Sequence, residues 1–286
     1  MIRSESTSNQ LEWRPPAWGA AGLLTFALTL SLTNGLLQAQ TRQEQGKLLV
    51  EQALSALGGD AFLQIRDRVQ NGRAYSFYQE NLRGMGVITI YERFDPLPED
   101  AGPDWLPVSR REVYTEEGDY YSLFQNGRGW EVTYRGARPL PQERLALYRE
   151  STRRNFFYFL RYRLQEPDLY FYYQGIEIID NVPTDAVDIA DSAGDMVTVY
   201  FRRSDHLPVQ QVYTRRDPKT RVPYEEKSIY SKYRSIGAVT IPWNIRNERD
   251  GEKIFEFFGA SAEINQDLGD DLFSLQQEVP VLPENP

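Results

Sequence analysis

The sequence lacks cysteine entirely and contains one histidine, His206, among its 286 residues. The absence of cysteine excludes disulfides, thiolate metal sites and cysteine nucleophiles. A single imidazole excludes zinc sites built from several histidines, and a Ser-His-Asp triad would have to use His206. The formal net charge is −9, so the phosphates of a nucleic acid would be repelled, and we expect no nucleic-acid partner.

Aromatic residues, in contrast, are abundant: the chain has 18 Tyr, 14 Phe and 5 Trp. Pleated sheets accommodate aromatic side chains well. Hydrophobic residues make up 41% of the chain and charged residues 26%, the balance of a globular protein with a proper core. The composition therefore favours a mainly β protein.

Residues 1–39 have the layout of a secretory signal peptide. A polar leader with Arg3 and Arg14 precedes a long uncharged run, "AWGAAGLLTFALTLSLTNGLL", and small residues follow it. This pattern predicts export, with cleavage just after Ala39. The alternative is an uncleaved anchor in the inner membrane, because the apolar run of about 20 residues is long enough to span a bilayer. Either interpretation predicts a periplasmic location, with a single domain over residues 41–286.

Hydrophobic periodicity divides the exported part into helices and many strands. A helical period predicts helices over 41–59 and 60–67, and one long helical stretch over 141–165. We expect the six arginines of this stretch to form a solvated face, and its "FFYFL" patch to pack on the sheet or to lie over an apolar cavity or a membrane surface. An alternating period predicts twelve strands, over residues 69–79, 84–94, 109–116, 119–127, 129–136, 169–179, 182–190, 195–203, 207–216, 222–234, 238–249 and 252–264.

Pro242 lies in the middle of the strand predicted over 238–249. Val239, Ile241, Trp243 and Ile245 alternate with polar residues, so the strand has one apolar face. Proline has no N–H to give to a sheet, and it is confined to edges, bulges and bends. We therefore expect a curved or open sheet. Short turns between nearly all strands predict a single antiparallel meander that one helical stretch interrupts.

The second half of the chain carries an ordered series of features. A strand ends in a charged turn before "LPV". Tyr233, Gly237, Ile241 and Pro242 follow at a spacing similar to Y-x-x-x-G-x-x-I-P, and then come a "DG" hairpin and a strand ending in "EIN". From about Val197 to Leu275 this series resembles the periplasmic lipoprotein-localisation carrier superfamily, of the LolA/LolB type. The resemblance implies a mainly β, α+β fold. It is a curved, half-open antiparallel β-barrel of about eleven strands, with helices covering the concave face over a cavity for acyl chains.

The leading functional hypothesis is a noncatalytic envelope protein that binds a lipid or lipoprotein acyl chain, for transport or sensing. Acyl binding requires little more than shape and apolar area. For every candidate, ordinary core packing is the alternative. The candidate lining residues are Val239, Ile241, Trp243, Ile245, Phe255, Phe257, Phe156, Phe159 and Leu160. The alternative function is an envelope scaffold or sensor subunit whose curved sheet binds a protein partner, such as an envelope membrane protein.

No motif in the sequence indicates catalysis or metal binding. His206 has Ser204 and Asp205 beside it on one turn, but the three groups of a triad must converge in space rather than in sequence. The acidic clusters within 116–119 and 267–271 lack the ordered alternation of a calcium loop. We therefore expect no catalytic residue, no metal and no cofactor.

Overall fold

The structure, a computed structural model, describes residues 41–98, 102, 105–115 and 120–283. The chain from Arg42 to Pro286 forms one compact unit, and the segment up to Thr41 is a separate unit. The predicted signal peptide of residues 1–39 and the acidic cluster at 116–119 lie outside the described residues. Within the described residues, no helix is both long and apolar enough to cross a membrane.

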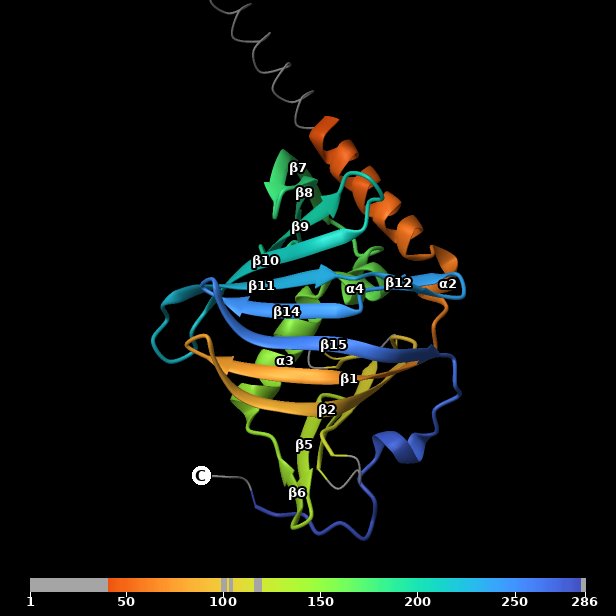
Figure 1. The fold of residues 1–286 in the computed structure, drawn as a ribbon, viewed down its shortest axis with the longest axis vertical. Coiled ribbons are helices and arrows are strands. Elements are labelled where there is room, and N and C mark those ends of the chain that lie inside the picture. Colours follow the sequence, from red (N-terminus) through yellow and green to blue (C-terminus); the bar gives the residue numbers. More distant parts are fainter. Residues whose placement is uncertain (1–40, 99–101, 103–104, 116–119, 284–286) are drawn as a thin grey trace, which may run out of the picture. The chain divides into compact units, whose positions relative to one another are not determined.

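Thirteen antiparallel strands form one sheet, in the order β6-β5-β4-β3-β2-β1-β15-β14-β11-β10-β9-β8-β7 (Figure 1). The first and last strands of the sheet in sequence, β1 and β15, are therefore neighbours near its centre. The outermost strands, β6 and β7, do not pair with each other in the described chain, so the predicted half-open, mainly β fold is confirmed. The strands are β1 Asp67–Tyr78, β2 Asn81–Phe94, β3 Val108–Val113, β4 Tyr121–Gln125, β5 Arg128–Thr133, β6 Gly136–Pro139, β7 Tyr170–Ile179, β8 Val182–Ala190, β9 Met196–Arg202, β10 Pro208–Arg216, β11 Pro223–Ser231, β14 Asn244–Arg249 and β15 Glu252–Ile264.

A second, two-stranded sheet consists of β12 Arg234–Ile236 and β13 Val239–Ile241. It arises because the predicted strands 222–234 and 238–249 each divide in two, and Pro242 lies in the gap between β13 and β14. The proline thus marks a break rather than a bend within one strand. The main sheet resumes there, where the Trp243 N–H donates to the Ser231 carbonyl at 3.2 Å.

The curvature of the main sheet has a local cause at its centre. The register between β1 and β15 shifts between Asn71 and Gly72. An added Cβ at Gly72 would lie 2.3 Å from the carbonyl oxygen of Phe258, so only glycine allows this close approach. Such bulges bend a strand and increase its twist.

The helices lie over the concave face and around the ends of the sheet. Residues 41–57 are helical, and the other helices are α2 Asp60–Leu63, α3 Gln142–Arg154, α4 Phe156–Tyr158, the π-helix η1 Phe159–Arg163 and the 3₁₀-helix η2 Asp270–Phe273. The long helix predicted over 141–165 is thus interrupted at Asn155. This residue has an extended backbone, and its side chain accepts hydrogen bonds from the N–H groups of Phe157 and Tyr158.

Of the six arginines of this stretch, only Arg144 is exposed and the other five are partly buried, so the solvated face that we predicted does not form. The Arg154 side chain is only 11% exposed and pairs with Glu150 and Asp195, each at 2.7 Å. Arg163 pairs with Glu166 and Asp191. Acidic partners in and just after the segment, and in the loop between β8 and β9, explain the difference, because buried guanidinium groups need opposite charges close by.

Apolar side chains form one main cluster where the helix 41–57, α4 and η1 meet β7–β9 and β13. Gly46 allows the helix 41–57 to approach β7 closely, since an added Cβ would lie 3.1 Å from the backbone of Phe171. A separate cluster around Leu123 and Phe273 packs η2 onto β3–β5. The C-terminal segment also covers the β6 edge, where the Ala137 N–H donates to the Pro280 carbonyl at 2.9 Å.

A buried amide on β10 connects the helical segment to the sheet. The Gln211 side chain accepts from the Phe156 N–H at 2.8 Å and from the Tyr230 hydroxyl at 2.9 Å. It also donates to the Arg154 carbonyl at 3.3 Å. Gln211 is 2% exposed. Two of its bonds reach the helical segment on either side of Asn155, and the third reaches Tyr230 on β11, so the amide connects this segment to the sheet.

Replacing this amide tests its role. Gln211→Leu leaves the Phe156 N–H and the Tyr230 hydroxyl without their partner, and we expect a loss of about 2 kcal/mol or more in unfolding free energy. Urea denaturation measures the loss, and hydrogen exchange at the Phe156 amide should accelerate. Gln165→Leu, at an exposed position after η1, serves as the matched control. Equal stability of the two variants would contradict the anchoring role.

Candidate ligand-binding cavity

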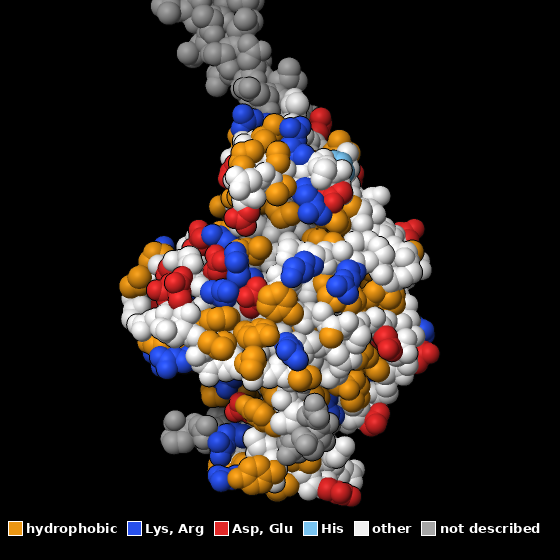
Figure 2. Space-filling model, in the orientation of Figure 1, with side chains coloured by type: hydrophobic (Ala, Val, Ile, Leu, Met, Phe, Trp, Pro, Cys, Tyr) orange, Lys and Arg blue, Asp and Glu red, His pale blue; other side chains and the backbone are white. Residues whose placement is uncertain are grey.

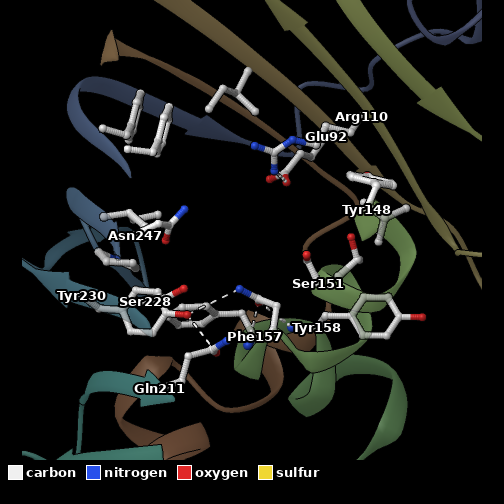
Figure 3. A pocket seen from close by; sticks show the side chains of 18 of the residues that line it. Glu92, Arg110, Tyr148, Ser151, Phe157, Tyr158, Gln211, Ser228, Tyr230 and Asn247 are labelled. Atoms are coloured by element: carbon white, nitrogen blue, oxygen red, sulfur yellow. Dashed lines mark hydrogen bonds and ion pairs between the residues drawn. The ribbon is translucent and has the colours of Figure 1, made fainter. Parts of the chain in front are cut away.

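A cavity of about 590 Å³ lies between the concave face of the sheet and the segment α3–η1 (Figure 3). Strands β1–β4 form one side of its floor, and β10, β11, β14 and β15 form the other. The roof residues are Leu147, Tyr148, Ser151, Thr152, Asn155, Phe157, Tyr158, Arg161 and Tyr162. The volume falls in the range of about 300–1,000 Å³ that is typical of small-molecule sites.

One side of the cavity carries a group of apolar side chains that strand register brings together, beside charged residues of β10, β11 and β14. Tyr230, Ile245 and Phe257 lie opposite one another across β11, β14 and β15. The next row consists of Ser228, Asn247 and Phe255, and Figure 3 shows Ser228 and Asn247 beside the open space. From the roof, Phe157 packs edge-on against Tyr230, with ring centroids 5.0 Å apart. We call this side the apolar wall, defined by Phe157, Tyr230, Ile245, Phe255 and Phe257.

The other side of the cavity carries a ladder of alternating charges. Arg68, Glu92 and Arg110 are directly opposite one another on β1, β2 and β3. Arg68 donates to Glu92 from Nε at 2.9 Å, and Arg110 donates to Glu92 from Nη1 at 2.5 Å. Arg110 also donates to Glu112, two residues further along the same strand, at 2.7 Å. Opposite charges in adjacent register stabilise a sheet.

The ladder keeps its carboxylate ionised despite burial. Burial alone would raise the pKa of Glu92, but the guanidinium groups of Arg68 and Arg110 outweigh it and lower the pKa from 4.5 to about 2. Burial likewise disfavours the charged form of Arg110. The carboxylates of Glu112 and Glu92 outweigh this effect and raise the pKa of Arg110. Glu92 and Arg110 are therefore both charged over the whole physiological range.

A second ion-pair group fixes α3 above β10. The Tyr213 hydroxyl donates to Glu226 at 2.6 Å, and the nearly buried Arg215 donates to Glu226 at 3.3 Å. Arg215 also donates to the Ser151 hydroxyl on α3 at 3.0 Å. At the opposite wall, Tyr148 stacks on Phe124 with centroids 3.9 Å apart. These contacts set the roof at two further points along α3.

The structure divides the nine predicted lining residues into two groups. Ile241, Ile245, Phe255 and Phe257 line the cavity. The other five belong to the main apolar cluster and are buried away from the cavity: Val239, Trp243, Phe156, Phe159 and Leu160. The break at Pro242 ends the alternation that placed Trp243 with Ile245. The interruption at Asn155 directs Phe156 toward Phe201, with ring centroids 5.3 Å apart. That any of these residues contacts an acyl chain remains a prediction.

The sequence reasoning missed the charged ladder, although its signal is present. Arg68 and Gln70, Ile90 and Glu92, and Arg110 and Glu112 each follow the two-residue period of one strand face. This pattern shows only that charged residues share faces. The cross-strand register that unites Arg68, Glu92 and Arg110 becomes visible only in the folded sheet.

His206 lies in the turn between β9 and β10, with a φ of 60°. The neighbouring Asp205 carboxylate accepts from Arg202 at 2.9 Å and from the Leu207 N–H at 3.2 Å, and it makes no triad contact with the imidazole. Neither residue lines the cavity. The part of the chain that the structure describes contains no cluster of three or more potential metal-ligating side chains.

Comparison with protein-family models gives no match, and comparison with curated proteins gives none either. Solved structures do resemble this chain. A DUF1329 family protein from Desulfovibrio piger is 14% identical with a TM-score of 0.53, over 82% of this chain and 97% of the other. A domain assigned to an outer membrane lipoprotein-sorting protein from Vibrio parahaemolyticus is 8% identical with a TM-score of 0.49, over 78% and 95% of the two chains.

A LolA superfamily protein from Nitrosomonas europaea is 13% identical with a TM-score of 0.45, over 78% of this chain and 97% of that protein. Identities this low concern the fold alone. The likeness to the Desulfovibrio protein shows a shared fold, and the open thirteen-stranded sheet with its helical cover agrees with the half-open form that the sequence predicted.

The lowered pKa of Glu92 makes stability depend on pH in a defined direction. Because the folded-state pKa of about 2 lies below the unfolded value of 4.5, ionised Glu92 contributes fully above about pH 4.5. That contribution is lost as pH falls toward 2. The shift corresponds to about 3 kcal/mol. Glu92→Gln should therefore lower the unfolding free energy at pH 7 by roughly this amount, and the difference from the unaltered protein should shrink toward pH 3.

Urea denaturation at pH 7, 5 and 3 measures this difference. Many carboxylates titrate in the same range, so the readout is the gap between variant and unaltered protein at each pH. Glu177→Gln, at an exposed position on β7, is the matched control and should show little gap at any pH. A constant gap for Glu92→Gln would contradict the assigned pKa.

Proposed function

We propose that this protein binds an acyl chain of a lipid or lipoprotein in the cavity between sheet and α3, as a noncatalytic carrier or sensor exported to the periplasm. The observation that carries the proposal is the cavity of about 590 Å³ with its apolar wall. Burial of an acyl chain against this wall would contribute about 25 cal/mol for each Å² removed from water. The signal-like layout of residues 1–39 supports export.

The charges of the cavity support a binding role over a catalytic one. A general base works best with a pKa near the operating pH, whereas that of Glu92 is held at about 2. Glu226 and Glu112 accept hydrogen bonds from Arg215 and Arg110. Each of these carboxylates is thus committed to an ion pair rather than left to accept a proton from a substrate.

A protein partner is a second candidate, supported by exposed apolar side chains. Tyr78, Leu82 and Met85 are 53–66% exposed on the β1–β2 hairpin, and Ile176 and Ile178 are exposed on the edge strand β7. On the face seen in Figure 2, however, hydrophobic side chains gather in several small groups with charged residues between them. The unfilled concave face favours the acyl-binding role, because a scaffold needs no such cavity.

Native mass spectrometry tests the proposal most directly. The protein would be purified from its own envelope without detergent, and its mass compared with that of the chain after organic extraction. A stoichiometric lipid or acylated peptide supports the proposal and identifies the cargo class. A protein free of lipid that also takes up no fluorescent fatty acid would favour the partner-binding role.

A cavity-filling variant gives a second test. Ser228→Trp places an indole in the open space beside Asn247, and we expect at least a tenfold loss in fatty-acid affinity with the fold retained. Ser261→Trp, at an exposed position that does not line the cavity, is the matched control and should bind normally. Fluorescent fatty-acid titration and circular dichroism provide the two readouts. Unchanged binding by Ser228→Trp would place the ligand elsewhere.

A further inference from the structure

Arg161 is a cation of the cavity roof with an unusual set of partners. It belongs to the π-helix η1, and its guanidinium lies over the rings of Phe94 and Phe62, with the Cζ atom 4.4 and 5.3 Å from the two centroids. Among the described residues, no carboxylate lies within ion-pairing distance of it. Its hydrogen bonds go instead to backbone carbonyls in the last residues of α2 and just after it.

These hydrogen bonds leave one edge of the guanidinium unused. Nη1 donates to the carbonyls of Leu63 at 2.6 Å and Ile65 at 3.0 Å, and Nη2 donates to the carbonyl of Phe62. A guanidinium has five N–H donors in a fixed planar fork. Among the described residues, Nε makes no hydrogen bond, so the Nε–H and one Nη2–H remain for a ligand. A carboxylate or phosphate that accepts from both would be held by two hydrogen bonds, and Arg161 is one of the residues that line the cavity.

The surroundings of Arg161 carry an excess of positive charge. Three guanidinium groups, those of Arg68, Arg110 and Arg161, line this side of the cavity with two carboxylates, Glu92 and Glu112. Both carboxylates are already bonded to Arg68 and Arg110. Arg68 also lies near the shared ring of Phe94, with its Cζ atom 6.0 Å from the centroid. We call this side the cationic pole, defined by Arg68, Arg110 and Arg161.

Burial lowers the pKa of Arg161 to about 10, and the nearby charge of Arg68 adds to the effect. The group is still protonated at neutral pH. A buried cation without a carboxylate partner is costly, and a bound anion removes part of that cost. The electrostatics of the pole therefore agree with its hydrogen-bonding geometry.

We propose that the ligand of this cavity is an anionic amphiphile whose carboxylate or phosphate head binds the free edge of Arg161 at the cationic pole. Its chain would then extend along the apolar wall of Ile245, Phe255 and Phe257. This inference rests on the proposed acyl-binding function and adds the chemical class of the head. The net charge of the protein is −9, so its surface on average repels an anion. The cationic pole therefore indicates that an anion binds inside the cavity.

The test compares ligands that share a chain and differ in the head. Hexadecanoate, hexadecyl phosphate and hexadecanol would each displace the neutral probe N-phenyl-1-naphthylamine from the unaltered protein at pH 8. We expect both anions to bind at least about tenfold more tightly than the alcohol, since hydrogen bonds between two charged groups are stronger than those to a neutral hydroxyl. Inorganic phosphate and acetate are included as heads without a chain, and neither should displace the probe at equal concentration.

Arg161→Met retains the apolar stem and removes the fork. We expect this variant to lose the preference for the anions while it still binds hexadecanol. Arg161→Lys retains the charge without the planar fork and should recover only part of the preference. Arg203→Met, at a half-exposed ion pair outside the cavity, is the matched control and should retain the full preference.

The outcomes separate the two proposals. Equal affinity of the unaltered protein for acid and alcohol would overturn the anionic head and leave acyl binding in place. No binding of any C16 ligand would overturn the acyl-binding function itself. Displacement by inorganic phosphate alone would assign the pole to a small free anion and overturn the amphiphile. The comparison of acid with alcohol needs no variant, so it decides the matter even where Arg161→Met does not fold.

Discussion

The height of the helical segment above the sheet depends on the amide of Gln211. The side chains of a concave sheet do not by themselves fill the space that the sheet encloses. A helix over this space therefore either packs directly on the sheet or is held away from it. Gln211 hydrogen-bonds to the backbone of the helical segment on either side of the interruption at Asn155. Arg215 hydrogen-bonds to Ser151, one turn earlier in α3. These polar contacts and the stack of Tyr148 on Phe124 together set the spacing between α3 and the sheet.

The order of the strands in the sheet separates the apolar residues of the cavity from its charged ladder. β14 and β15 bring apolar residues, and β1–β3 bring the charged ladder, on either side of the central β1–β15 pair. Buried charges of this density persist only when each has an opposite charge or a hydrogen-bonding partner close by. Arg161 meets this requirement through backbone carbonyls alone, and so it differs from the other arginines of the cavity.

The parts of the fold that could be predicted are those with a local signal. Two-residue alternation located twelve strand regions, and Pro242 correctly indicated that the sheet could not continue unchanged through it. The interruption at Asn155 had no comparable signal, because its extended backbone depends on contacts with β10 and β11. The lining was predicted in part for the same reason. Ile245 and Phe257 follow from alternation within a strand, whereas Arg68, Glu92 and Arg110 meet only through a register that loops and hairpins determine.

The adjacency of β1 and β15 has a consequence for how the chain assembles. Arg66 and Asn265 share a hydrogen bond across a sequence separation of 199 residues, and the strand that precedes Asn265 completes the middle of the sheet. Chains dominated by such distant pairings fold slowly, because loop-closure entropy is lost before the contacts form. The centre of this protein therefore forms only after nearly all of the chain has emerged. A polypeptide with this topology has no finished core until the residues before Asn265 can pair with β1.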